Sequence, residues 1–139
     1  MTSDIQPTTT RHNPKELGTP PGYSQIVEVP AASRLFFIAG QTALDSGGNL
    51  IGRGDIAAQA EQVFRNLSVA LTAVGCTAAN LVKLTVFLRD MDDLANYREA
   101  RNRFFASVTP PAAPAVTLVE VSRLYGPEFL IEIEAIAAA

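Results

Sequence analysis

The chain has 139 residues, a net charge of −3 and a sequence pI of about 5.1. This length fits one domain with a core large enough to be stable without disulfides or bound metal ions. The lone Cys76 excludes a disulfide framework and a Cys-rich metal site. The acidic balance and scattered basic residues exclude the electrostatic footprint of a nucleic-acid-binding protein.

The first half of the chain is predicted to contain two strands and a long helix. Residues 1–17 are polar, include two prolines and are predicted to form a flexible arm, which leaves residues 18–139 as a single domain. Residues 24–29 and 34–41 are predicted as strands of a hairpin, because only Pro-Ala-Ala-Ser separates them. Asp55 is typical of an N-cap for a helix that runs to Val74, before Gly75.

The second half is predicted to contain three strands and one helix. Residues 81–89 alternate like a strand, and Asp92 or Asp93 is suited to cap a helix from Leu94 to about Phe105. Two Val, Ile and Leu-rich runs, 115–122 and 129–138, follow as strands. The predicted order is therefore β-β-α-β-α-β-β.

The strand pattern predicts an oligomer. Two helices cover only one face of a sheet, yet residues 115–121 are apolar on both faces of their strand. In the last strand, Ile131 and Ile133 lie on one face and Glu132 and Glu134 on the other. Burying carboxylates on such a strand is energetically unfavourable, so we expect them to face water, a partner chain or a ligand. We therefore expect the free sheet face to be covered by further copies of the chain.

An ordered set of motifs resembles the YjgF/RidA family of reactive intermediate deaminases, also described as endoribonuclease L-PSP-like. The motifs are GYSQ, IAGQ, VKLTVFLRDMDD, VEVSRL and IEIEAIA, and the resemblance runs from about Gly18 to Ala138. It implies an α+β, chorismate-mutase-like fold with a mixed sheet and two helices packed on one face. It also implies a homotrimer with small-molecule clefts between its subunits.

The resemblance further implies roles for individual residues. Tyr23 matches the tyrosine of the cleft, Gly40 matches the glycine whose backbone lines it, and Glu132 matches the catalytic glutamate that positions the attacking water. The family's catalytic arginine, which clamps a substrate carboxylate, aligns with Val116 in this chain. Val116 and Leu118 would then form an apolar substrate-binding wall, since valine cannot bind a carboxylate.

Arg98 is a further candidate for the cleft. It stands where active family members carry an asparagine early in the second helix. No arginine occurs between residues 108 and 122. Arg98 either supplies the missing positive charge from another direction or is a solvated helix arginine.

Two functions remain open at this point. The first is a deaminase that hydrolyses an enamine or imine other than the usual amino-acid-derived ones; the alternative is a non-catalytic metabolite-binding or regulatory trimer that uses the same cleft. A ribonuclease is disfavoured because the chain lacks a basic–aromatic stripe. We expect no metal or cofactor, no nucleic-acid partner and no membrane contact. A cytoplasmic location is expected because neither an apolar run of about 18 residues nor a signal peptide is present.

Overall fold

The computed structural model describes residues 9–139. In chain order the strands and helices are β1 (Thr10–His12), β2 (Ile26–Glu28), β3 (Leu35–Gln41), α1 (Ile56–Ala73), β4 (Leu81–Leu88), α2 (Leu94–Phe105), β5 (Ala115–Glu120) and β6 (Ile131–Ala138). Apart from β1, this is the order that the sequence predicts. In these residues no helix is both long enough and apolar enough to span a membrane.

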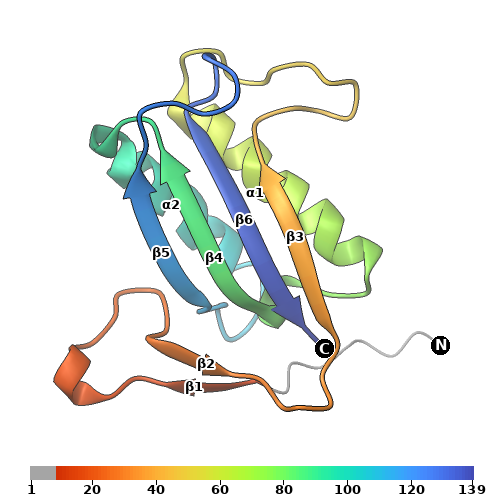
Figure 1. Cartoon of the computed structure of the whole chain (residues 1–139), viewed down its shortest axis with the longest axis vertical. Helices are drawn as coiled ribbons and strands as arrows, with labels where there is room; N and C mark the ends of the chain where they lie inside the picture. Colours follow the sequence, from red (N-terminus) through yellow and green to blue (C-terminus); the bar gives the residue numbers. More distant parts are fainter. Residues whose placement is uncertain (1–8) are drawn as a thin grey trace.

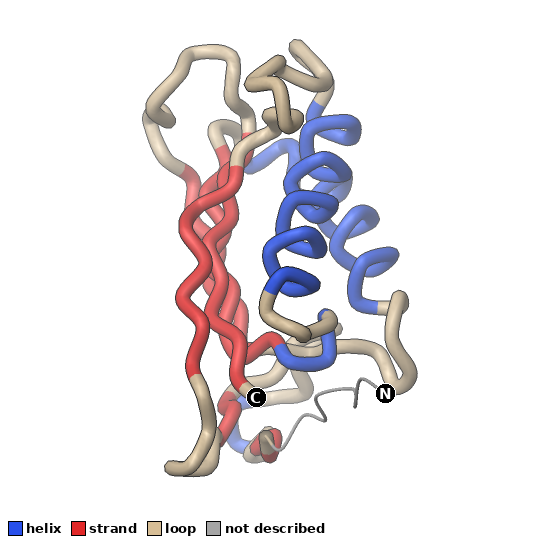
Figure 2. The backbone as a smooth tube through the Cα atoms, turned by 90° about the vertical axis from the view of Figure 1, so that its right-hand side faces the viewer, coloured by secondary structure: helices blue, strands red, loops and turns tan. Residues whose placement is uncertain are grey.

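The main sheet has four strands in the order β3-β6-β4-β5. Strand β6 is antiparallel to both of its neighbours, whereas β4 and β5 are parallel, so the sheet is mixed. Helices α1 and α2 cover one face of this sheet, and no helix or strand of residues 9–139 covers the opposite face (Figure 1, Figure 2). The predicted α+β fold with both helices on one face is confirmed. We call the uncovered side the free face.

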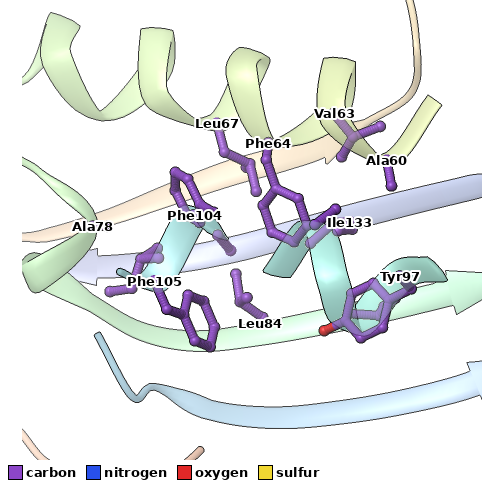
Figure 3. Packing of buried hydrophobic residues seen from close by; sticks show 14 of the residues in the cluster. Ala60, Val63, Phe64, Leu67, Ala78, Leu84, Tyr97, Phe104, Phe105 and Ile133 are labelled. Atoms are coloured by element: carbon purple, nitrogen blue, oxygen red, sulfur yellow. The ribbon is translucent and has the colours of Figure 1, made fainter. Parts of the chain in front are cut away.

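The core lies between the sheet and the two helices (Figure 3). Alternate residues of β4 and β6 are buried, as the period of two in a strand requires. Helix α1 contributes Phe64, which stacks on Phe104 of α2 with ring centroids 4.9 Å apart. Leu84 of β4 and Ile133 of β6 are fully buried beneath them. This packing fixes which side of each strand faces the helices.

The helix ends agree with the prediction for α1, and for α2 they agree in position but not in the side chain that caps the helix. The Asp55 carboxylate accepts a hydrogen bond from the Ala58 backbone N–H at 3.1 Å, and Gly75 adopts a φ of 75° just after the helix. Before α2 the capping side chain is Asp90, whose carboxylate accepts from the Asp92 N–H at 2.9 Å. Of the two predicted caps, Asp93 occupies the N-cap position of α2 but its side chain makes no capping hydrogen bond. Asp92 lies within the 3-10 turn over Met91–Asp93 that precedes the helix.

The predicted hairpin is wrong. Strand β2 pairs with β1, and β3 pairs with β6 at the other end of the chain. Backbone hydrogen bonds between Arg34 and Ala139, of 2.7 and 3.0 Å, extend this second pairing. Strand β6 is longer than β2, so it can form more backbone hydrogen bonds with β3 and adds a buried face. These interactions favour the pairing with β6 over a hairpin with the neighbouring β2. Strand β1 lies within the predicted arm, of which residues 1–8 lie outside the described residues; the arm's flexibility stays a prediction.

Candidate functional site

Glu132 and Gly40 are brought together on neighbouring strands. The register between β3 and β6 shifts between Ile38 and Gln41, and this irregularity places Gly40 against the Glu132 side chain. A Cβ atom added to Gly40 would lie 2.9 Å from the Cδ and 3.0 Å from the Cγ of Glu132. A side chain at position 40 would therefore displace the Glu132 carboxylate from the place it occupies beside the glycine.

The surroundings of Glu132 perturb its acidity. Ile131 and Ile133 are fully buried against the helices, so alternation sends Glu132 to the free face, where it is half-buried. Burial, and secondarily the charge of Glu134, raises the pKa of the Glu132 carboxyl above its usual value. No cation of residues 9–139 forms an ion pair with it. A carboxylate with a raised pKa and no ion-pair partner is suited to act as a general base.

Tyr23 lies at the opposite edge of the sheet. It is half-buried and follows Gly22, whose φ is 79°. The next residue, Ser24, donates its backbone N–H to the Pro114 carbonyl at 3.0 Å and its hydroxyl to the Ala113 carbonyl. These contacts hold the Tyr23 segment beside the beginning of β5.

Val116 and Leu118 are partly buried and pack against the core on the helix-covered side of β5. The alternate residues, Thr117 and Val119, are exposed on the free face. In a single chain the apolar wall predicted from Val116 and Leu118 therefore does not share the free face with Glu132. Arg98 is exposed on α2.

The candidate residues thus form two groups in one chain. The β3 group, Gly40 and Glu132, lies at the edge formed by β3 and β6. The β5 group, Tyr23, Val116 and Leu118, lies at the edge formed by β5. Strands β3 and β5 are the two outer strands of the sheet, as Figure 1 shows. One chain alone does not assemble both groups into one cleft.

A groove that the sequence did not predict opens next to Gly40. Its volume is about 670 Å³, and it is bordered by β3, by the loop that follows it and by α1. The hydroxyl of Tyr125 is within hydrogen-bond distance, 2.7 Å, of the Thr42 hydroxyl at its edge. Tyr125 is 70% exposed. The sequence indicates only a turn at Tyr125-Gly-Pro. The residues around this turn carry no sign that it contacts the end of β3, which is 83 positions away along the chain.

Arg101 is a charged residue of α2 that the structure buries and to which the sequence assigns no role. It is only 8% exposed on α2, and its Nη2 donates to Asn102 Oδ1 at 3.1 Å. The sequence does show that this arginine lies on the apolar stripe of the predicted helix. A charged residue at such a position is rarely buried without a partner, which could have marked Arg101 as unusual. Within the part of the chain that is described, no group of three or more His, Cys, Asp or Glu side chains is placed to hold a metal ion.

Replacing Gly40 by Ala is expected to lower turnover by up to about a hundredfold. The added methyl group would push the Glu132 carboxylate out of position, and if Glu132 is the base that the family resemblance implies, misplacement by about 1 Å can cost that much. The backbone at position 40 needs no positive φ, so the fold should persist. Steady-state kinetics with circular dichroism checks this. Gly47→Ala, in an exposed loop, is the control, and equal activity of the two variants would contradict the role of Gly40.

Comparison with known proteins agrees with this architecture. The family model described as Endoribonuclease L-PSP matches residues 14–139. A RutC family protein of Pyrococcus horikoshii is 40% identical over 128 residues, covering 92% of this chain and 93% of the relative. A mouse protein named 2-iminobutanoate/2-iminopropanoate deaminase is 36% identical over 117 residues, covering 83% and 79% of the two chains.

A solved structure gives the same result in three dimensions. A protein of unknown function of the conserved Rid family, YyfB of Yersinia pestis, matches with a TM-score of 0.81 and 32% identity. The match covers 94% of this chain and 98% of that one. Because the family model spans nearly all of the described residues and the fold is shared, the chain belongs to the YjgF/RidA family, the family that the endoribonuclease L-PSP model describes.

Proposed function

We propose that this protein hydrolyses an enamine or imine to a carbonyl compound and ammonia, in a cleft that forms between subunits of a homotrimer. The observation that carries the proposal is the Glu132 carboxylate, which has a raised pKa, forms no ion pair within residues 9–139 and lies against the backbone of Gly40. A base of this kind is what activation of water near neutral pH requires.

The reaction needs one base and one water molecule. Glu132 takes a proton from water as the water oxygen forms a bond to the imine carbon, and the C=N electron pair moves to nitrogen, which takes up a proton from solvent. The protonated Glu132 then gives its proton to the amine nitrogen of the carbinolamine. The C–N bond breaks, ammonia leaves, and the hydroxyl proton passes to solvent as the carbonyl group forms. Glu132 serves first as base and then as acid.

The separation of the two groups of residues supports a cleft between subunits. The β3 group supplies the base, and the β5 group lies at the far edge of the same sheet. The free face also carries exposed apolar residues, among them Phe37 at 75% and Val119 at 40%. Large exposed apolar patches mark interaction sites. In a closed ring of copies, the β3 edge of one subunit meets the β5 edge of the next.

The position of Val116 argues for a substrate other than the usual one. The mouse relative is named for imines of 2-oxo acids, which carry a carboxylate. At the position where the family resemblance places the arginine that clamps this carboxylate, the present chain has an uncharged valine that packs against the core. We therefore propose a substrate that is bound without an arginine on β5.

Hydrolysis of 2-iminobutanoate by this protein is expected to stay close to the spontaneous rate. A charge-assisted hydrogen bond contributes about 1.5–3 kcal/mol, and loss of the clamp removes more when the contact tightens in the transition state. The imine can be generated by an amino-acid oxidase and its disappearance followed with a trapping reagent. The mouse deaminase serves as the positive control. A rate well above the spontaneous one would show that another cation replaces the missing arginine.

The second candidate function is binding of a metabolite without turnover, which the uncharged Val116 favours. The two functions differ in what Glu132 does. In a panel of enamines and imines, an enzyme shows accelerated ammonia release that disappears in Glu132→Gln. A binding protein shows saturable binding with no acceleration for any compound, which would contradict the proposed hydrolase.

A further inference from the structure

Tyr125 is an exposed aromatic residue whose position is nevertheless fixed. Its side chain is 70% exposed. Its hydroxyl lies 2.7 Å from the hydroxyl of Thr42, which is buried. Its ring is tilted by 47° against the buried ring of Phe129, with the two centroids 4.7 Å apart. A tyrosine side chain has two torsions, and these contacts fix both its ring and its hydroxyl. Covering the exposed part of the ring with a ligand therefore costs little further conformational entropy.

The backbone around Tyr125 brings the ring to this place. A Cβ atom on Gly126 would lie 2.8 Å from Cε2 of Phe129, so the chain passes close over the Phe129 ring because residue 126 has no side chain. The Phe129 N–H donates to the Gly126 carbonyl at 3.2 Å and closes this turn. The turn lies at the end of the sheet where β3 ends and β6 begins (Figure 1). Tyr125 thus reaches from the segment before β6 to the end of β3.

The ring of Tyr125 borders the groove beside Gly40. The volume of this groove, about 670 Å³, lies within the range of about 300–1,000 Å³ that is typical of small-molecule sites. Helix α1 forms the side opposite β3, and the loop after β3 is fixed to it. The Asn66 side-chain amide donates to the carbonyls of Thr42 and Leu44 at 3.1 and 2.9 Å. The groove is therefore a preformed site with rigid walls.

The charged side chains that border the groove already have partners within the protein. Oδ1 of Asp45 accepts the backbone N–H of Gly47 at 2.9 Å. Arg65 lies 4.0 Å from Glu61, one turn earlier on α1. These two groove residues have opposite charges, so they do not select a ligand by its net charge. The groove instead offers the aromatic face of Tyr125, which favours contact with another planar group.

The groove and the Glu132 carboxylate lie beside the same residue. Gly40 borders the groove, and the place that its Cβ atom would take is 3.0 Å from Cγ of Glu132. Because Gly40 has no side chain, its backbone alone lies between the carboxylate and the groove. A substrate whose reacting carbon is at Glu132 can extend past Gly40 and reach the ring of Tyr125.

We propose that Tyr125 is the specificity-determining residue of the cleft and that the natural substrate carries an uncharged planar group, unsaturated or aromatic, next to its reacting C=N bond. This inference rests on the proposed function, which places the reacting carbon at Glu132. The planar group lies in the groove against the Tyr125 ring, in an offset-stacked or edge-to-face arrangement. A saturated group of the same size fills the groove without this contact, so Tyr125 distinguishes the two.

Two uncharged probes of similar size, benzamide and cyclohexanecarboxamide, test this inference because only benzamide has a flat ring. Each is titrated into the full chain, and binding is followed by NMR. The wild type is expected to bind benzamide about 5- to 20-fold more tightly. Tyr125→Leu keeps an apolar side chain and should lose this preference, whereas Tyr125→Phe keeps the ring and should retain most of it. Equal affinities in the wild type, or an unchanged preference in Tyr125→Leu, would overturn the proposal.

A variant that fills the groove shows where the probes bind. Val69 is 65% exposed and borders the groove from α1. Val69→Trp should strongly weaken binding of both probes, whereas Ala57→Trp, at an exposed position in the first turn of the same helix, should bind them like the wild type. Benzamide binding that survives Val69→Trp would overturn the groove as the site. A groove covered by a second copy of the chain would admit neither probe, and that result would overturn the proposal as well.

The binding readout is independent of turnover, so the two proposals can fail separately. A preference for benzamide in a protein that releases ammonia from no imine would contradict only the proposed hydrolase. Hydrolysis with equal kcat/KM for imines that carry an aromatic ring and for their saturated counterparts would contradict only the role of Tyr125.

Discussion

Replacing Glu132 by Gln should lower turnover by about a hundredfold or more and leave the proposed trimer intact. Glutamine keeps the shape of the side chain but cannot take a proton from water, and general base catalysis contributes about 10²–10⁴-fold. Glu132 is half-buried and forms no ion pair with the described residues, so its loss should not unfold the protein. Steady-state kinetics with the imine that the wild type hydrolyses fastest, together with light scattering, checks both parts.

The pH dependence of the same reaction gives an independent check. Glu132 must be deprotonated to act as a base, and its pKa is raised by burial and by Glu134. Activity should therefore fall as pH decreases through this raised pKa. Glu134→Gln removes the neighbouring charge, lowers the pKa of Glu132 and should move the acidic limb of kcat/KM to lower pH. An acidic limb unchanged by Glu134→Gln would contradict the assignment.

Replacing Val119 by Glu is expected to convert the proposed trimer into a folded but inactive monomer. Val119 is 40% exposed in the single chain, so the monomer can hydrate the new carboxylate. Burial of that carboxylate against another sheet would leave an unpaired charge in an apolar interface, which is strongly unfavourable. Light scattering should give three times the 14.8 kDa chain mass for the wild type and a single chain mass for the variant.

A matched substitution on the other side of the molecule controls for general effects of charge. Ala57→Glu places the same side chain at an exposed position in the first turn of α1, away from the free face. It should remain trimeric and active. A wild type that is monomeric at micromolar concentration, or a Val119→Glu variant that is still trimeric, would contradict the proposed assembly.

The sequence predicted local features of the fold well because they depend on periodicity. The alternation around Ile131 and Ile133 placed Glu132 on the face opposite the helices, and the structure confirms this. The Asp55 cap and the stop at Gly75 are likewise short-range features, and both are confirmed.

Features that depend on contacts between distant segments were predicted poorly. The pairing of β3 with β6 and the register shift that places Gly40 against Glu132 depend on residues nearly a hundred positions apart. The same holds for Arg101, which is buried partly by the segment at Pro21 and Gly22. The helical stripe showed that Arg101 points inward, but only the packed structure shows that no carboxylate of residues 9–139 meets it.

The most direct test of a cleft built by two subunits is complementation between two impaired variants. Glu132→Gln disables the β3 group, and Tyr23→Ala disables the β5 group. When the two proteins are unfolded, mixed in equal amounts and refolded together, each mixed trimer contains one cleft with both groups intact. Random mixing should then restore about one quarter of the wild-type activity. Activity no higher than the mean of the two separate variants would show that both groups act within one subunit.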